Sequence, residues 1–198
     1  MLPVLGLLWV LAWAPAGEGV GPGPTEQLRG AVDRVLRVLE DPALKDAARA
    51  AERRRAIRQI ADEIFDFDET ARRAMAQHWR SLTVDQRKEF VDLFTELLER
   101  AYIAKIELYG GERIQYPGER VEGDYATVFT RLITKKGVEV PIDYRMLRRD
   151  DRWRAYDVSI EGVSLVANYR TQFNSIVRTA SVDELLGKLR SRVAETRR

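Results

Sequence analysis

The chain has 198 residues, which is enough for one domain with a sizeable hydrophobic core but barely enough for two. Its 33 Lys and Arg side chains almost balance 31 Asp and Glu side chains, so the net charge is only +2. The longest basic run, Arg53-Arg54-Arg55, has acidic neighbours and is typical of a solvated helix face. Nucleic-acid-binding proteins concentrate basic residues on one surface, so this composition argues against that class of function.

The first sixteen residues differ from the rest of the chain. Residues 1–16 carry no charged side chain, are rich in Leu, Val, Trp and Ala, and end in Ala14-Pro15-Ala16, the small-x-small pattern of a signal-peptidase site. The apolar stretch is shorter than the roughly 20 residues of a transmembrane helix. No Lys or Arg precedes it, which departs from a typical leader, so a short membrane anchor or a misplaced start codon is the alternative. We predict a cleavable signal peptide over residues 1–16.

The chain contains no cysteine. Disulfide bonds, thiolate metal ligands, a cysteine nucleophile and lipid attachment at an N-terminal cysteine are therefore excluded. After cleavage of the leader we expect a soluble, unanchored protein whose stability comes from core packing.

A Gly/Pro linker over residues 17–24 separates the leader from a predicted single domain, residues 25–198. Thr25 is the expected N-cap of a first helix, which Asp41-Pro42 ends. A second amphipathic pattern follows and is predicted to end near Ile64.

Capping signals mark the next two helices. Asp66 or Asp68 can cap a short helix, and Thr83 with Gln86 forms the pattern of a capping box. After Thr83, large apolar residues recur at intervals of three and four until Gly110-Gly111, which predicts a long helix with a broad apolar stripe.

Beyond this helix the apolar residues recur with the period of a strand. Four strands are predicted, at residues 115–116, 124–134, 138–149 and 152–160. The links between them are short, which indicates an antiparallel meander. In the third strand apolar and charged residues alternate, so one face of the sheet should be buried and the other solvated.

Two more helices are predicted after the last strand, one from about Ser164 and one from the capping box Ser181-x-x-Glu184. This order of elements gives an α+β fold class. We predict a four-stranded antiparallel meander sheet with one face covered by the N- and C-terminal helices and the other face open.

Catalytic and metal-binding signals are weak. Gly162-Val163-Ser164 matches the first half of the Gly-x-Ser-x-Gly motif of hydrolases, but Val166 replaces the second glycine. A helix N-cap explains Ser164 equally well, and the single histidine, His78, lies far upstream. Asp66-x-Asp68-Glu69 stands at a helix start, where acidic residues favour the helix dipole. We predict no enzyme, no cofactor and no metal, with a periplasmic hydrolase using Ser164 as an alternative.

A helix-covered sheet with many large apolar side chains suits a carrier of an apolar ligand. An ordinary hydrophobic core has the same residue types, so periodicity alone does not distinguish the two.

Short motifs along the chain add a resemblance to a known family. The first half contains Phe65-x-Phe67, Ala71-Arg72-x-Ala74, His78-Trp79, Phe90-x-x-x-Phe94 and Leu97-Leu98. The second half contains Asp143-Tyr144-Arg145, Trp153-x-x-Tyr156-Asp157-Val158, Glu161-Gly162-Val163-Ser164-Leu165-Val166 and Asn168-Tyr169-Arg170-x-x-Phe173. In their order and spacing these motifs resemble the MlaC family, the periplasmic phospholipid-binding proteins of the maintenance-of-lipid-asymmetry system, also called the toluene-tolerance family. The resemblance spans roughly residues 25–192.

This resemblance implies a soluble phospholipid carrier in the periplasm of double-membraned bacteria. It implies an apolar cavity between sheet and helices that holds the acyl chains, with phospholipid as the transported ligand. The implied partners are an inner-membrane ABC transporter complex with its periplasmic substrate-binding ring and an outer-membrane lipoprotein–porin complex. Such a carrier would maintain outer-membrane lipid asymmetry without covalent chemistry. A carrier of another apolar ligand, such as a sterol, a hopanoid or a hydrocarbon solvent, is the alternative.

Within the implied cavity we expect lipid contacts from the apolar face of the sheet and from the helices that face it. The predicted lipid-binding residues are Phe90, Phe94, Leu97, Val128, Val140, Ile142, Tyr144, Val163, Val166 and Tyr169. The hairpin around Arg148 and Arg149 is a candidate for partner docking, with a solvated turn as the alternative.

Overall fold

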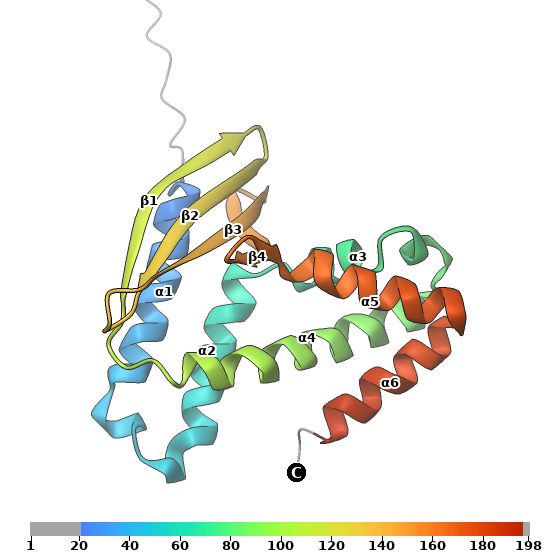
Figure 1. Cartoon of the computed structure of the whole chain (residues 1–198), viewed down its shortest axis with the longest axis horizontal. Coiled ribbons are helices and arrows are strands. Elements are labelled where there is room, and N and C mark those ends of the chain that lie inside the picture. Colours follow the sequence, from blue (N-terminus) through green and yellow to red (C-terminus); the bar gives the residue numbers. More distant parts are fainter. Residues whose placement is uncertain (1–20, 196–198) are drawn as a thin grey trace, which may run out of the picture.

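The computed structural model of the chain describes residues 21–195 (Figure 1). The predicted leader, residues 1–16, and the first half of the predicted linker, residues 17–20, lie outside the described residues. The α-helices are α1 (Pro24–Glu40), α2 (Ala50–Ile64), α3 (Phe67–Met75), α4 (Val84–Ile106), α5 (Leu165–Thr179) and α6 (Val182–Glu195). Short 3-10 turns are η1 (Pro42–Leu44), η2 (Ala47–Arg49) and η3 (Ala76–Ser81). The strands are β1 (Arg113–Glu122), β2 (Tyr125–Ile133), β3 (Glu139–Arg149), β4 (Arg152–Ile160) and β5 (Val163–Ser164).

The strands form one sheet in the order β1-β2-β3-β4-β5, with every neighbouring pair antiparallel. This confirms the predicted α+β meander and adds one short strand, β5. Two-residue turns at Asp150-Asp151 and Glu161-Gly162 have positive φ at both positions, the geometry of type I′ hairpin turns. The second turn brings Val163 opposite Ile160 and so creates β5.

Strand β1 is longer than predicted. The sequence indicated a strand at residues 115–116 and a link from residue 119, whereas β1 continues to Glu122. Its pairing with β2 shifts register between Gln115 and Gly118, around Pro117. Proline has no N–H for the ladder and is tolerated at such irregularities on an edge strand, which hid the strand in the sequence.

Most predicted caps are present. Thr83 and Gln86 form the reciprocal capping box of α4. The carboxylate of Asp66 accepts the Glu69 N–H at 2.8 Å and caps α3. Thr25 was expected as the cap, but α1 begins two residues earlier than this implies, at Pro24, with Gly23 in the cap position. The Thr25 N–H donates instead to the carboxylate of Glu119 on β1, at 2.9 Å.

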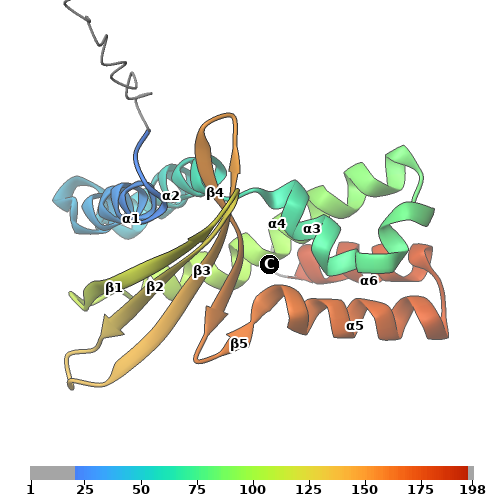
Figure 2. The ribbon, with the colours of Figure 1, turned by 90° about the horizontal axis from the view of Figure 1, so that it is seen from above.

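The helices divide between two hydrophobic cores (Figure 2). The first core lies between α1, α2 and one face of the sheet, and its buried members are Leu28, Ala31, Ile60, Ile64, Ala126, Val128, Met146, Trp153 and Ala155. The second core joins α3, α4, α5 and α6 beyond the end of the sheet, and its buried members are Ala71, Ala74, Met75, Leu82, Phe90, Phe94, Val166, Phe173, Leu185, Leu186 and Leu189. None of the helices within residues 21–195 combines the length and apolar character needed to cross a membrane.

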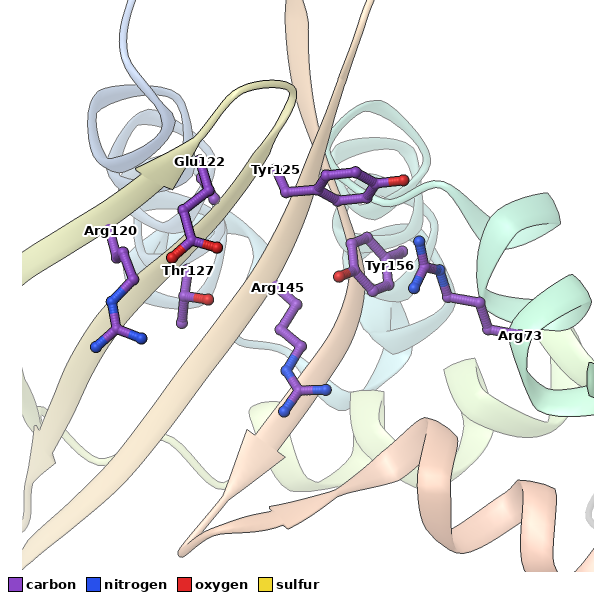
Figure 3. Close-up of a pocket in the computed structure, with 8 residues that line it drawn as sticks. Arg73, Arg120, Glu122, Tyr125, Thr127, Arg145 and Tyr156 are labelled. Carbon is purple, nitrogen blue, oxygen red and sulfur yellow. The ribbon is translucent and has the colours of Figure 1, made fainter.

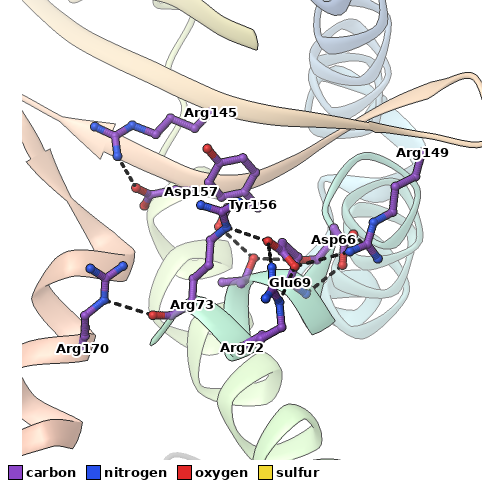
Figure 4. Close-up of polar contacts among 10 residues, drawn as sticks. Asp66, Glu69, Arg72, Arg73, Arg145, Arg149, Tyr156, Asp157 and Arg170 are labelled. Carbon is purple, nitrogen blue, oxygen red and sulfur yellow. Dashed lines mark hydrogen bonds and ion pairs between the residues drawn. The ribbon is translucent and has the colours of Figure 1, made fainter. Parts of the chain in front are cut away.

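A buried ion network joins the two parts (Figure 4). The side chain of Glu69 is 1 % exposed and accepts hydrogen bonds from Arg72 at 2.6 and 2.7 Å and from Arg73 at 2.7 Å. Arg149, from the β3–β4 hairpin, lies 3.3 Å from Glu69 and 3.1 Å from Asp66. Burial acts to raise the pKa of Glu69, but the hydrogen bonds from Arg72 and Arg73 outweigh it and hold the pKa below its ordinary value.

Candidate ligand-binding site

The apolar face of the sheet, which carries Val128 and faces α1 and α2, is covered unevenly. In its covered half, the side chains are almost fully buried; they are Ala126, Val128, Met146 and Ala155, at 0–5 % exposure. In its open half, nearer the β2–β3 hairpin and β5, the apolar side chains are half-buried or exposed; they are Ile114, Leu132, Val140, Ile142, Ile160 and Val163. None of this second group belongs to either core of the described residues. The open half therefore has apolar surface available for a ligand.

Val163 shows the difference most clearly. It pairs with Ile160 at the end of the sheet and is 59 % exposed. Large apolar side chains are normally buried, and one exposed beside other half-buried apolar residues marks a candidate binding surface.

Helix α4 changes its environment along its length. Phe90 and Phe94, in its first half, are 0 % and 1 % exposed. Leu97, Leu98 and Tyr102 follow on the next turns and are only half-buried. An α-helix with apolar residues on several sides needs more than one partner, and the second half of α4 has an incomplete cover.

A hollow of about 630 Å³ lies between α4, α5 and α6, and we call it the helical hollow. Its apolar lining consists of Leu97, Tyr169, Phe173, Ile176, Leu185 and Leu189. Its polar rim includes Gln172, Glu184, Lys188, Ser191, Arg192 and Glu195. This volume lies within the range of about 300–1,000 Å³ that small-molecule pockets occupy, and its chemistry suits an apolar chain.

The start of α5 connects the open half of the sheet to the helical hollow. Val163 lies in β5, which runs directly into α5, and Tyr169 lies on the second turn of that helix. Asp157 of β4 fixes this start, because its carboxylate accepts the Ser164 O–H at 2.6 Å and the Val166 N–H at 3.0 Å. The Ser164 hydroxyl oxygen in turn accepts the Ala167 N–H at 3.0 Å and caps the helix, as predicted.

Packed aromatic rings close the inner end of the helical hollow. Tyr169 meets Phe94 edge-on at 5.0 Å between ring centroids, and Phe173 lies 5.2 Å from Phe94 and 5.4 Å from Phe90. Such edge-to-face contacts stabilise a rigid wall rather than a loose core. Burial raises the pKa of Tyr169, so its phenol is uncharged at neutral pH.

Two phenols on the apolar face of the sheet are also uncharged. Burial raises the pKa of Tyr144 to about 12 and raises the pKa of Tyr116 as well. The Tyr116 hydroxyl is buried and has no hydrogen-bond partner among the described residues. Thr130, which is 3 % exposed, is a further polar side chain on this face, and its hydroxyl donates to the Ile142 carbonyl at 2.6 Å.

Ser164 and His78, the two residues that a hydrolase would need, do not contact each other. Ser164 is hydrogen-bonded to Asp157, whereas the ring of His78 lies 2.9 Å from the side-chain oxygen of Asn174. Asn174 is ten residues beyond Ser164 on α5, about 15 Å away along the helix. Within residues 21–195, no three His, Asp or Glu side chains are grouped so that they could hold a metal ion.

Comparison with known proteins identifies the family. The profile of the family described as MlaC protein matches residues 29–191. The chain belongs to the MlaC family.

Two individual proteins are similar to this MlaC-family chain. The intermembrane phospholipid transport system binding protein MlaC of Haemophilus influenzae is 23 % identical over 128 residues, which cover 62 % of this chain and 60 % of that protein. The solved structure of the phospholipid-binding protein from Ralstonia solanacearum, in complex with a phospholipid, matches with a TM-score of 0.78 and 25 % identity. The match covers 89 % of this chain and all of that chain.

The ten predicted lipid-binding residues of this MlaC-family chain fall into four environments. Val128 and Tyr144 pack in the first core, and Phe90, Phe94 and Val166 pack in the second. Val140, Ile142 and Val163 lie on the open half of the sheet, and Leu97 and Tyr169 line the helical hollow.

Several residues of the candidate site were not in the prediction. Phe173, Ile176, Leu185 and Leu189 line the helical hollow, and their three-four spacing in the two last helices was visible as helix patterning. That patterning identifies the apolar side of a helix but does not tell which helix it faces.

Arg148 and Arg149 both have partners within the protein. Arg148 pairs with Asp124 at 2.8 Å and lies over the ring of Trp153, and Arg149 belongs to the buried ion network. Both arginines therefore have intramolecular partners, and partner docking at this hairpin stays a prediction.

Proposed function

We propose that this chain is a carrier of phospholipid, which holds acyl chains against the open half of the sheet and in the helical hollow. The observation that carries the proposal is the open half itself, where apolar side chains from β1, β2, β3 and β5 are left out of both cores. A protein selected only for stability would bury such side chains, because each buried methylene contributes about 0.8 kcal/mol.

The relatives support a phospholipid as the ligand. The structural match covers the whole of the Ralstonia solanacearum protein chain, and that protein was solved in complex with a phospholipid. The Haemophilus influenzae relative is a binding protein of an intermembrane phospholipid transport system. Sterols and hopanoids are apolar as well, so the identification of the bound ligand described below separates them from phospholipid.

The energetics suit reversible transfer. Two acyl chains with about 30 buried methylenes gain roughly 24 kcal/mol relative to water, more than the practical limit of non-covalent affinity. A lipid drawn from a bilayer is already buried, however, so its transfer into the protein changes the free energy much less. Protein and membrane can then exchange lipid in both directions.

The wider role follows from this exchange. We propose that the leader at residues 1–16 directs the protein to the periplasm. There it moves lipid between an outer-membrane lipoprotein–porin complex and the substrate-binding ring of an inner-membrane ABC transporter. The carrier itself would bind and release lipid without covalent chemistry, and the absence of a Ser164–His78 contact among the described residues supports binding over hydrolysis.

Identification of the co-purified ligand tests the proposal. The full chain, leader included, would be expressed in a double-membraned bacterium and purified without detergent. We expect native mass spectrometry to find the protein with a bound phospholipid and thin-layer chromatography of an organic extract to show phospholipid. A sterol, a hopanoid or a hydrocarbon in the extract, or protein free of any lipid, would contradict the proposal.

A transfer assay tests whether the protein both takes up lipid from a membrane and releases it to another. Lipid-free protein would be incubated with vesicles containing a fluorescent phospholipid and then moved to unlabelled vesicles. We expect the label to move in both steps, whereas a protein that takes up lipid and retains it would not act as a carrier.

A further inference from the structure

The polar face of the sheet contains a second hollow, separate from the candidate lipid site. It has a volume of about 360 Å³ and is bounded by β1, β2, β3, β4 and α3 (Figure 3). We call it the arginine hollow; its lining residues are Arg73, Arg120, Glu122, Tyr125, Ala126, Thr127, Arg145 and Tyr156. Because the sheet itself lies between this hollow and the open half of the apolar face, a ligand here would not contact acyl chains held there.

The lining has an excess of positive charge. Three arginines and one glutamate line the hollow, which leaves two more positive than negative groups. The arginines come from three separate elements, α3, β1 and β3, so the fold brings them together across the sequence. In Figure 3, Arg120 and Arg145 extend from the same side of the sheet, and Arg73 reaches over the ring of Tyr156.

Two of the three guanidinium groups retain free hydrogen-bonding capacity. Among the described residues, Arg120 has no ion pair. Arg145 is 54 % exposed, and its one carboxylate neighbour, Asp157, lies at 3.7 Å. Both oxygens of Asp157 already accept short hydrogen bonds, from Ser164 at 2.6 Å and from Val166 at 3.0 Å. The Asp157 charge faces Arg145 only at this longer distance, and the guanidinium donors of Arg145 stay available to a ligand.

Arg73 is positioned differently from the other two. Its Nε donates to Glu69 at 2.7 Å, and its guanidinium stacks 3.9 Å from the centroid of the Tyr156 ring. These contacts fix the group at the edge of the hollow, near Tyr125. A preorganised arginine beside two exposed ones reduces the entropy lost when an anion binds.

The chemistry points to a phosphate group. A guanidinium offers parallel N–H donors that match the oxygens of phosphate in a bidentate fashion, and charge-assisted bonds of this kind are among the strongest hydrogen bonds. A phosphate monoester carries a charge of about −1.5 to −2 near pH 7, so exposed guanidinium groups attract it more strongly than they attract a single carboxylate. The hydroxyl of Thr127 adds a neutral donor to the lining.

We propose that the arginine hollow binds a phosphate group, with Arg120 and Arg145 as its main ligands and Arg73 as a fixed third donor. The group would be inorganic phosphate or the monoester headgroup of a lipid such as phosphatidic acid at a membrane surface. The site is independent of the acyl-chain site, and its test does not rely on the lipid content of the protein.

Titration with inorganic phosphate tests the site directly. Isothermal calorimetry and amide NMR would be recorded on the full chain at constant ionic strength, with chloride as the reference anion. We expect saturable binding with shifts centred on Thr127 and Tyr125. Binding should strengthen as the pH rises through about 6, where phosphate becomes a dianion and the arginines stay charged.

Matched variants separate a site from general charge attraction. Arg120→Gln and Arg145→Gln should each weaken phosphate binding by about tenfold or more, since each removes charge-assisted bonds. Arg131→Gln is the control, because Arg131 is exposed on the same face of the sheet but pairs with Glu139, outside the hollow. Equal losses in all three variants, or binding unchanged in the first two, would overturn the proposal.

Vesicles distinguish the two sources of the phosphate group. Flotation with phosphatidylcholine vesicles would be compared with and without phosphatidic acid. Binding that depends on phosphatidic acid and is lost in Arg120→Gln assigns the hollow to a lipid headgroup. Binding of inorganic phosphate without this vesicle effect assigns it to free phosphate. If the wild-type protein shows neither binding event, the site is refuted. The NMR shifts of the wild-type protein give this answer even if a variant folds poorly.

Discussion

The two halves of the sheet's apolar face are built from similar residues but are used differently. The covered half carries Met146 and Val128, both 0 % exposed, beneath α1 and α2. The open half carries Ile142 and Val140, which stand on the same strand and face but are only half-buried. The covered half acts as the core of the fold, and the open half is the candidate ligand surface.

The polar anchors differ between the two halves as well. The buried network of Glu69, Asp66 and Arg149 ties α3 to the β3–β4 hairpin, at the covered end of the sheet. At the open end, the Asp157 carboxylate ties α5 to β4 by accepting the Ser164 O–H and the Val166 N–H. From this difference we expect the stability of the fold to depend mainly on the covered end of the sheet and ligand binding to depend mainly on the open end.

The largest expected loss of stability comes from Glu69→Gln. Removing one partner of a buried ion pair leaves the other charges uncompensated and typically costs about 3–5 kcal/mol. We expect urea denaturation to show a loss of this size. Glu63→Gln is the control, because Glu63 pairs with Arg34 on the surface, where both side chains are exposed. Similar losses in both variants would remove the distinction between the two ends of the molecule.

The same substitution should change the response to acid. Hydrogen bonds from Arg72 and Arg73 hold the pKa of Glu69 below its ordinary value of 4.5 despite its burial. Its contribution to stability is therefore complete above the unfolded-state pKa and is lost as the pH falls through the lower folded-state pKa. Below pH 4.5 the wild-type protein should lose stability more steeply than Glu69→Gln in urea titrations at a series of pH values.

Met146→Ala is expected to have the next largest effect. Its side chain is fully buried, and truncation of such a residue costs about 2–5 kcal/mol in lost burial and cavity formation. Ile142→Ala, on the same strand but in the open half, should cost clearly less in lipid-free protein. Denaturation midpoints of the two variants measure the contrast, and equal costs would mean that the open half is also core.

Ser164→Ala should have a smaller effect. The substitution removes the cap of α5 and the hydrogen bond to Asp157, for an expected cost of about 1–2 kcal/mol. Lipid should remain bound, because the hydroxyl makes its hydrogen bonds within the protein. Thr83→Ala, which removes the cap of α4, provides a matched comparison. A hydrolytic activity that disappears in Ser164→Ala alone would contradict this structural role.

Val163→Glu should change stability least and lipid content most. The side chain is 59 % exposed, and substitutions on the surface usually change stability by less than about 0.5 kcal/mol. A carboxylate at this position would face the acyl chains and eject them, as native mass spectrometry can measure. Val84→Glu is the control, since Val84 is 79 % exposed at the start of α4, away from the site. Undiminished phospholipid in Val163→Glu would show that the ligand lies elsewhere.

Local signals in the sequence predicted much of the fold. The capping box Thr83–Gln86 and the strand at residues 152–160 follow from short-range patterns, and both are present. The extent of β1 was missed because Pro117 interrupts the strand pattern, and the start of α1 was missed because it depends on a partner far along the chain. Thr25 bonds to Glu119, which is 94 residues away. Pairing of this kind leaves no periodic trace in the sequence.

The candidate site was harder to predict than the fold. Alternation along β3 identified the apolar face that carries both Ile142 and Met146. It did not show that α1 and α2 would cover Met146 and leave Ile142 half-buried. The arginine hollow gave no signal, because Arg73, Arg120 and Arg145 are separated in sequence and each is an ordinary surface residue in its own element. The strand register and the position of α3 bring them together.

Helix α4 belongs to the second core and is also tied to α2 of the first core, and this limits how the protein can make room for a ligand. It runs without interruption over 23 residues, about 35 Å, from the aromatic rings of the second core to ion pairs with Arg53 and Arg58 of α2. The two cores cannot move as independent bodies unless these ion pairs break. Side chains on the second half of α4, such as Leu97 and Leu98, are only half-buried and can change rotamer without moving the two cores.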